Sequence, residues 1–241
     1  MAEIIPAIIP KNLDDLKDHL DMVKDHVSIV QVDVVDGKMV PAKGWPYYMT
    51  GYDDYFQDIL NEKEGLPDWE KIDYEIDLMV TDPEKATRDW IQAGARRIVI
   101  HLESPVDVKS VLRRLNQEYD SIKNSLLGVE IGVAINIETP NEKVYEFLNE
   151  LDQNGLPLAD FVQFMGIRNI GFQGQIFDGA VIDKISELHE KYPGTIISVD
   201  GGVNENNAAK LIEVGVSRLI CGSAIFEANN PLEALEYFKS L

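Results

Sequence analysis

Five polar side chains interrupt apolar runs that are otherwise typical of buried strands. They are Asp33, Asp77, His101, Asn136 and Asp200. An unpaired buried carboxylate is costly, so such groups must share protons, face a water-filled mouth or hold a cation. One of them alone could be a satisfied structural residue. Five in five strands favour a common centre for acid–base chemistry.

Three glycine-bearing segments follow the late apolar runs. They are GFQGQ at 171–175, GGVNENN beginning at Gly201 and Gly202, and GSAIF beginning at Gly222 and Ser223. Glycines there expose backbone N–H groups, and a helix N-terminus favours an anion. Asn204 is expected to cap the helix after the second segment. These segments together predict a phosphate-binding site.

The elements that must position these residues alternate along the chain. Short apolar runs are predicted as strands at 4–10, 28–35, 74–80, 96–102, 128–137, 159–165, 195–200 and 217–222. Amphipathic stretches predict helices within 12–26, 82–94, 107–122, 141–155, 178–194, 204–215 and 231–241. The strands are apolar without alternation, which indicates a parallel sheet buried on both faces.

Eight strand–helix units in 241 residues predict one (β/α)8 TIM barrel that spans residues 1–241 as a single domain. A doubly wound open sheet is the alternative. That fold usually has a Gly-rich turn after its first strand, and the segment IIPAIIPKN has none. In a barrel, the residues that end the strands face one mouth, and Ala7 and Met165 join the five polar residues there.

The connection from Lys38 to Asp73 is unusually long and rich in aromatic residues. Connections of this length are often functional. A helix with additional aromatic packing, or a contact between subunits, would explain the same composition. The sequence leaves these alternatives open.

Composition excludes several classes of partner. The chain has 22 basic and 42 acidic residues, a net charge of −20, which disfavours nucleic acid and anionic membranes. Cys221 is the single cysteine, and its apolar surroundings predict a small core residue. Neither a signal peptide nor an 18-residue apolar span is recognisable, so we expect a cytoplasmic protein.

Several motifs, in one order along nearly the whole chain, resemble the ribulose-phosphate 3-epimerase family. They are VDVVDGKMVP, DLMVTDPE, GVAINIETP, GFQGQ, VDGGVNENN and CGSAIF. The resemblance implies a TIM barrel that epimerises a ketopentose phosphate at C3 through an enediolate. Two aspartates exchange protons and a divalent metal stabilises the negative oxygens. It also implies a small phosphorylated sugar as the ligand and a homo-oligomer.

Carried over position by position, the resemblance assigns the proton-transfer roles to Asp33 and Asp200. It assigns phosphate binding to Gly171, Phe172, Gly174, Gly201, Gly202, Gly222 and Ser223.

The chain departs from the family at its metal site. The resemblance implies a site of two histidines and two aspartates, and Gln31 and Asp77 stand at the histidine positions. A site of Gln31, Asp33, Asp77 and Asp200 would be all oxygen, which favours Mg²⁺ or Mn²⁺ over Zn²⁺, or no tightly bound metal. Without a cation, at least one clustered carboxylate should be protonated. His101 could then supply charge stabilisation, or it could be a structural histidine at the mouth.

Two further departures lie elsewhere. Ala7 replaces a small hydroxyl residue at the end of the first strand, and Gln173 replaces a third glycine of the loop after the sixth strand. That loop also lacks the family's proline before Gly171. These changes affect residues that the resemblance places around the substrate.

Two other functions compete with an epimerase. Sugar-phosphate decarboxylases that resemble orotidine-phosphate decarboxylase carry Asp-x-Lys-x-x-Asp, and here Met79 occupies the lysine position between Asp77 and Asp82. A non-catalytic sugar-phosphate sensor or degenerate paralogue would explain the lost histidines.

Overall fold

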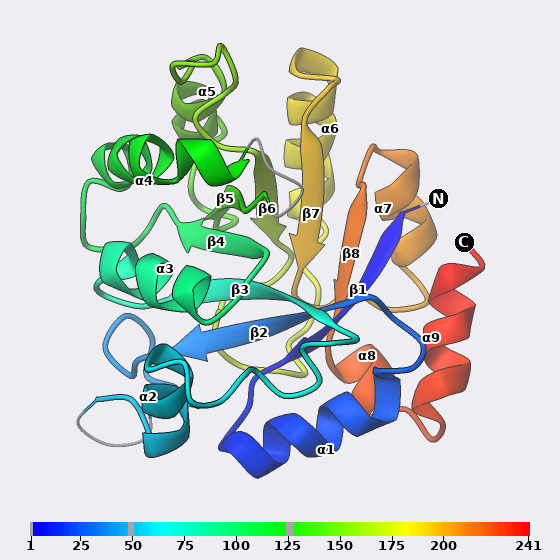
Figure 1. Cartoon of the computed structure of the whole chain (residues 1–241). Coiled ribbons are helices and arrows are strands. Elements are labelled where there is room, and N and C mark those ends of the chain that lie inside the picture. The colour runs from blue at the N-terminus through cyan, green and yellow to red at the C-terminus, as the bar shows by residue number, and fades with distance from the viewer. Residues whose placement is uncertain (1, 48–50, 124–127) are drawn as a thin grey trace.

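Eight parallel strands close into a barrel in chain order (Figure 1). The computed structural model describes residues 2–47, 51–123 and 128–241. The strands are β1 (Glu3–Ile8), β2 (Ile29–Val35), β3 (Asp73–Met79), β4 (Arg97–His101), β5 (Glu130–Ile135), β6 (Phe161–Met165), β7 (Ile196–Asp200) and β8 (Arg218–Cys221). The pairing of β8 with β1 completes the barrel, which confirms the TIM-barrel prediction. The open-sheet alternative is wrong.

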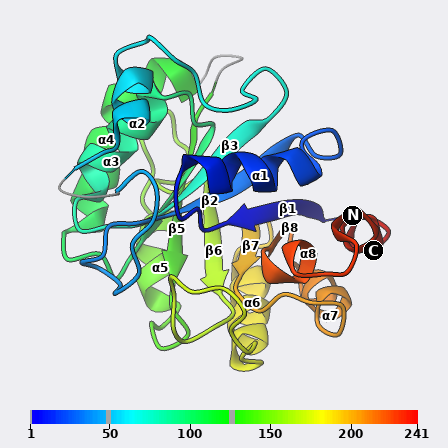
Figure 2. The same cartoon turned by 90° about the horizontal axis from the view of Figure 1, so that it is seen from below.

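Helices surround the strands on the outside (Figure 2). They are α1 (Leu13–Val23), α2 (Asp54–Leu60), α3 (Pro83–Gln92), α4 (Val108–Lys123), α5 (Glu142–Leu148), α6 (Ala180–Lys191), α7 (Ala208–Glu213), α8 (Ser223–Phe226) and α9 (Pro231–Lys239). Asp82 caps α3 and Pro83 begins it, within the range predicted for this helix. The prediction for Asn204 is wrong. Asn207 precedes α7, and the Asn204 side chain instead accepts from the backbone N–H of Asn206.

Strand register brings the predicted polar residues to the same interior. Asp33 pairs with Asp77 across β2 and β3, and Met165 pairs with Asp200 across β6 and β7. Successive side chains of a strand alternate between its two faces, so paired residues share a face. The strands are almost fully buried on both faces because helices cover the outside.

The long connection before β3 packs its aromatic residues against α3. Trp45 and Phe56 are fully buried, and both rings contact Trp90 at centroid distances of 5.7 and 4.5 Å. The segment also contains α2. This arrangement favours the aromatic-packing interpretation; Tyr48, one of the aromatic residues, lies outside the described residues.

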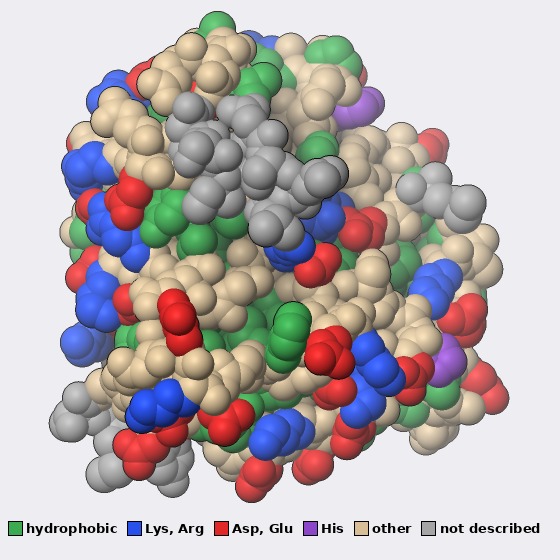
Figure 3. All heavy atoms as spheres, viewed as in Figure 1, with side chains coloured by type: hydrophobic (Ala, Val, Ile, Leu, Met, Phe, Trp, Pro, Cys, Tyr) green, Lys and Arg blue, Asp and Glu red, His purple; other side chains and the backbone are tan. Residues whose placement is uncertain are grey.

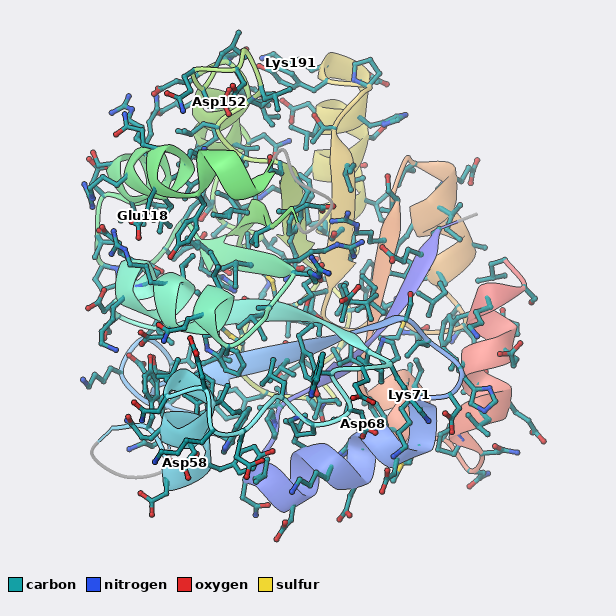
Figure 4. The ribbon with its side chains drawn as sticks, viewed as in Figure 1. Asp58, Asp68, Lys71, Glu118, Asp152 and Lys191 are labelled. Carbon is teal, nitrogen blue, oxygen red and sulfur yellow. The ribbon has the colours of Figure 1, made fainter. Side chains whose placement is uncertain are left out.

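Charged side chains of both signs are interspersed on the face shown in Figure 3. Lys71 pairs with Asp25 at 2.8 Å and Asp68 pairs with Lys24 at 3.2 Å, which connects the segment before β3 to the end of α1 (Figure 4). Ion pairs at the surface contribute little to stability because solvent screens them. Cys221 is buried, as predicted. Within the described ranges, no helix has the length and apolarity needed to cross a membrane.

Candidate active site

Three carboxylates from separate strands meet inside the barrel. Asp33 lies on β2, Asp77 on β3 and Asp200 on β7, and one oxygen from each lies within 4.8 Å of the others. All three are buried, with Asp77 completely inaccessible. The sequence prediction that these residues converge is therefore matched by the geometry.

The side-chain amide of Gln31 joins two of these carboxylates. Its Nε2 donates to Asp33 Oδ1 at 2.7 Å and to Asp200 Oδ2 at 3.0 Å. The side-chain oxygen of Gln31, Oε1, is buried and has no hydrogen-bond partner within the described structure. Gln31 thus fixes the spacing of the two carboxylates that the family resemblance assigns to proton transfer.

The third carboxylate is held on both of its oxygens. Asp77 Oδ1 lies 2.8 Å from His101 Nε2, and Asp77 Oδ2 accepts a hydrogen bond of 2.9 Å from Gln163 Nε2. Asp77 does not line the cavity described below. These contacts hold the Asp77 carboxylate in position, away from the space that a substrate could occupy.

Sequence reasoning missed Gln163. The residue is a lone polar side chain in the apolar strand FVQFM, which is the same signal that identified Asp33 in β2. It lies in the middle of β6, away from the strand ends at which the site residues were predicted. Its partner on β3 becomes visible only when the barrel closes.

His101 is completely buried beneath the mouth, not exposed at it. Burial alone would lower the pKa of His101. The negative charge of Asp77 and the side-chain interactions with Asp77 and Glu103 outweigh burial and raise that pKa to about 10. The imidazolium therefore places one positive charge beside the three carboxylates.

Burial raises the pKa values of Asp33 and Asp200. Repulsion from Asp200 and Asp77 adds to the shift at Asp33, and burial together with repulsion from Asp77 raises the pKa of Asp200 to about 7. The Gln31 hydrogen bonds oppose both shifts. Neighbouring carboxylates that cannot both ionise easily share a proton near neutral pH, so one can act as an acid while the other acts as a base.

A small cavity opens beside Asp33 and Asp200. Its lining includes these predicted site residues: Ala7, Asp33, Met165, Gly171, Phe172, Gly174, Asp200, Gly201, Gly202, Gly222 and Ser223. Gln31, Asp77, His101 and Asn136 do not line it. Among the described lining residues none is Lys or Arg, so the backbone must supply most donors to an anion.

Close packing and left-handed backbone require glycine at two positions of the cavity wall. Gly202 has φ +70°, and a Cβ there would lie 2.8 Å from the backbone nitrogen of Phe177. Gly171 has φ +84°, and a Cβ there would lie 2.8 Å from Val40. Both positions keep the backbone of the loops after β6 and β7 open toward the cavity.

Asn136 lies apart from the centre. Its backbone N–H donates to Glu103 Oε1 at 2.9 Å, and its carbonyl accepts from Lys184 Nζ at 2.8 Å. These contacts organise the segment after β5.

The donor set fits a hard divalent cation. Three buried carboxylates have oxygens within reach of one ion and form an all-oxygen donor set. Gln31 turns its Nε2, not its Oε1, toward Asp33 and Asp200, so it does not join this set in the orientation that the structure shows. The same three carboxylates would otherwise rely on Gln31, Gln163 and His101 to offset their repulsion.

The fold and the site define a TIM-barrel protein with an acidic, amide-bridged centre below a glycine-lined cavity. The family model described as "Ribulose-phosphate 3 epimerase family" matches residues 3–226, and the chain belongs to that family.

Relatives in sequence carry the same description. The chain is 33% identical over 215 residues to "Ribulose-5-phosphate-3-epimerase, chloroplastic" of Arabidopsis thaliana, with 88% of this chain and 66% of that protein covered. It is 28% identical over 218 residues to "Ribulose-phosphate 3-epimerase" of Aquifex aeolicus, with 89% and 84% covered.

Among solved structures, KGPDC from Streptococcus mutans is similar at a TM-score of 0.68 and 14% identity, covering 100% of this chain and 96% of that one. The 3-hexulose-6-phosphate synthase from Salmonella typhimurium is similar at a TM-score of 0.66 and 17% identity, covering 98% and 97%. At these identities the likeness concerns the fold.

Proposed function

We propose that this protein is a 3-epimerase that acts on a phosphorylated ketopentose such as ribulose 5-phosphate. The observation that carries the proposal is that Asp33 and Asp200 both line the cavity while one amide of Gln31 joins them. The family membership and the names of the relatives agree with this activity.

The chemistry requires an acid and a base on the two sides of one carbon. Asp33 comes from β2 and Asp200 from β7, and the proposal requires a substrate that turns one face of C3 to each carboxyl group. The ionised group removes the C3 proton, and the protonated group delivers a proton to the opposite face. Raised pKa values keep one group protonated near pH 7, which suits both steps.

The glycine-lined wall would hold the phosphate. Gly201, Gly202, Gly222 and Ser223 line the cavity, and they lie on the segments that follow β7 and β8. The loops after the last two strands of such barrels are common phosphate sites. Binding the phosphate there would orient the sugar chain toward Asp33 and Asp200.

A divalent cation, Mg²⁺ or Mn²⁺ rather than Zn²⁺, would be held by Asp33, Asp77 and Asp200, and Gln31 would join them only with its side-chain amide turned to present Oε1. When bound, it supplies positive charge that stabilises the oxygens of a developing enediolate. His101, fixed on Asp77, contributes further positive charge from below.

The direct test is exchange of the C3 proton of ribulose 5-phosphate in deuterated water, followed by NMR with added Mg²⁺, Mn²⁺ or Zn²⁺ and with chelator. We expect exchange together with formation of xylulose 5-phosphate. Failure of exchange in every condition, for both ketopentose and ketohexose phosphates, would count against an epimerase. Phosphosugar binding without any exchange would instead favour the sensor alternative.

A decarboxylase receives less support from the cavity. Met79 occupies the position where the lysine of that motif would stand, and it lines the cavity.

The predictions of a homo-oligomer and of a cytoplasmic location do not depend on the chemistry of the site. Analytical sedimentation tests the first prediction, and cell fractionation tests the second.

A further inference from the structure

Two departures from the family pattern meet in the structure. Gln173, on the segment after β6, donates from Nε2 to the carbonyl oxygen of Ala7 on β1 at 3.3 Å. The two residues are 166 positions apart in sequence. Gln173 Nε2 also lies 3.3 Å from the point that a Cβ on Gly222 would occupy, so the amide reaches the rim between β1 and β8.

Part of this rim is apolar. The Ala7 and Ile220 side chains line the cavity there, and both are almost completely buried. Asp33, Asp200, Gly222 and Ser223 line the same cavity. The Gln173 amide therefore brings a side-chain donor to a cavity that also holds the two carboxylates and the glycine wall.

The contact with Ala7 leaves the amide available. At 3.3 Å the hydrogen bond is longer than the usual distance of about 2.9–3.0 Å, so it is weak and can be exchanged for a substrate oxygen. One N–H suffices for Ala7, which leaves the second N–H and Oε1 for other partners. A sugar chain carries hydroxyl groups that match both.

We propose that Gln173 contacts the hydroxylated chain of the substrate between its phosphate and its reacting carbon, in place of the hydroxyl group that Ala7 lacks. The proposal rests on the proposed function and adds a specificity-determining residue to it. Because Gln173 belongs to the β6–α6 segment and not to β1, bound substrate would hold that segment against the β1–β8 rim.

The test uses ribitol 5-phosphate, which has no carbonyl and cannot form an enediolate, with inorganic phosphate as a second probe. Dissociation constants are measured by calorimetry for the wild-type protein, Gln173→Ala, Ala7→Ser and the double variant. Gln153→Ala, in an exposed turn away from the cavity, is the matched control. Exchange of the C3 proton is measured in parallel to separate KM from kcat.

We expect Gln173→Ala to weaken ribitol 5-phosphate binding about tenfold and inorganic phosphate binding by less than about twofold, as for one lost hydrogen bond to the sugar. Ala7→Ser in the Gln173→Ala background should recover at least about threefold of this loss. A role in folding alone would give no such recovery.

Unchanged ribitol 5-phosphate affinity in Gln173→Ala, with active wild-type protein, would overturn this inference and leave the epimerase proposal intact. If Ala7→Ser does not restore ribitol 5-phosphate affinity in the Gln173→Ala background, the Gln173 amide does not replace a hydroxyl group at position 7. A wild-type protein that neither binds ribitol 5-phosphate nor exchanges the C3 proton would overturn both proposals together.

Discussion

Gln31 donates a hydrogen bond of 3.0 Å to Asp200, a residue 169 positions away on a different strand, while it also binds Asp33. Gln31, which differs from the family pattern, is therefore part of the hydrogen-bond network of the candidate active site. Its amide brings a partial positive charge to two carboxylates without the fixed charge of a metal ion.

Replacing Gln31 tests this role. Gln31→Leu removes the shared donor and should lower the rate of C3 exchange by about ten- to a hundredfold, since hydrogen bonds to charged groups contribute roughly 1.5–3 kcal/mol. Gln31→His should shift the metal that gives most activity toward Zn²⁺. The measurement is exchange rate against metal concentration, and an unaltered metal ranking in Gln31→His would contradict the assignment of Gln31 to the cation site.

Asp33→Asn and Asp200→Asn should each abolish most C3 exchange, by a factor of at least about 10²–10⁴, because each variant lacks one proton-transfer group. Ribitol 5-phosphate binding should survive in both, as the glycine wall is untouched. Calorimetry and NMR exchange on the same samples check the two statements. Near-normal turnover in either variant would exclude that residue from proton transfer.

The metal-free protein should become less stable as pH rises from about 4 to about 7. The folded-state pKa of Asp200 is raised from 3.8 to about 7, so its stabilising contribution is complete below the unfolded pKa and is lost as pH rises through the folded one. This shift corresponds to at most on the order of 4 kcal/mol.

Urea unfolding in chelator at several pH values measures the effect. Asp200→Asn, which cannot titrate, should make the profile less steep, while the raised pKa values of buried Asp33 and Glu75 keep part of the slope. Added Mg²⁺ or Mn²⁺ should also reduce the slope in the wild-type protein by stabilising the ionised carboxylates. A wild-type profile that rises over this range would contradict the raised pKa.

Gln163→Leu should lower the free energy of unfolding by about 1–3 kcal/mol, because Asp77 Oδ2 would lose its buried donor. Gln117→Leu, on the exposed surface of α4, is the matched control and should change stability by less than about 0.5 kcal/mol. Urea titration of both variants makes the comparison. Equal stability of the two would show that Gln163 does not anchor Asp77.

Gly202→Ala and Gly155→Ala form a pair that tests the glycine wall. Both glycines have positive φ, at +70° and +78°, but only a Cβ at Gly202 would meet neighbouring atoms. Each variant should lose about 1–2 kcal/mol of stability from the left-handed backbone. Only Gly202→Ala should also weaken binding of sugar phosphate, by at least about tenfold, since Phe177 and its loop must shift. Calorimetry that finds equal affinities would remove Gly202 from the binding site.

Local patterns in the sequence are enough to predict the order of the eight strands and to mark Asp33, Asp77 and Asp200 within them. These features are local: continuous apolar runs specify buried strands, and a polar residue within such a run is visible without knowledge of its neighbours. The family motifs also marked Gln31, Ala7 and Gln173 as departures.

Contacts among these residues depend on how the barrel closes. Barrel closure and strand register place Gln163 on Asp77, Gln31 between Asp33 and Asp200, and Gln173 over Ala7. Side-chain contacts between distant strands depend on the shear and closure of the whole sheet, which no local pattern contains. For the same reason His101 proved to be a buried partner of Asp77, and Asn136 proved to lie outside the cavity.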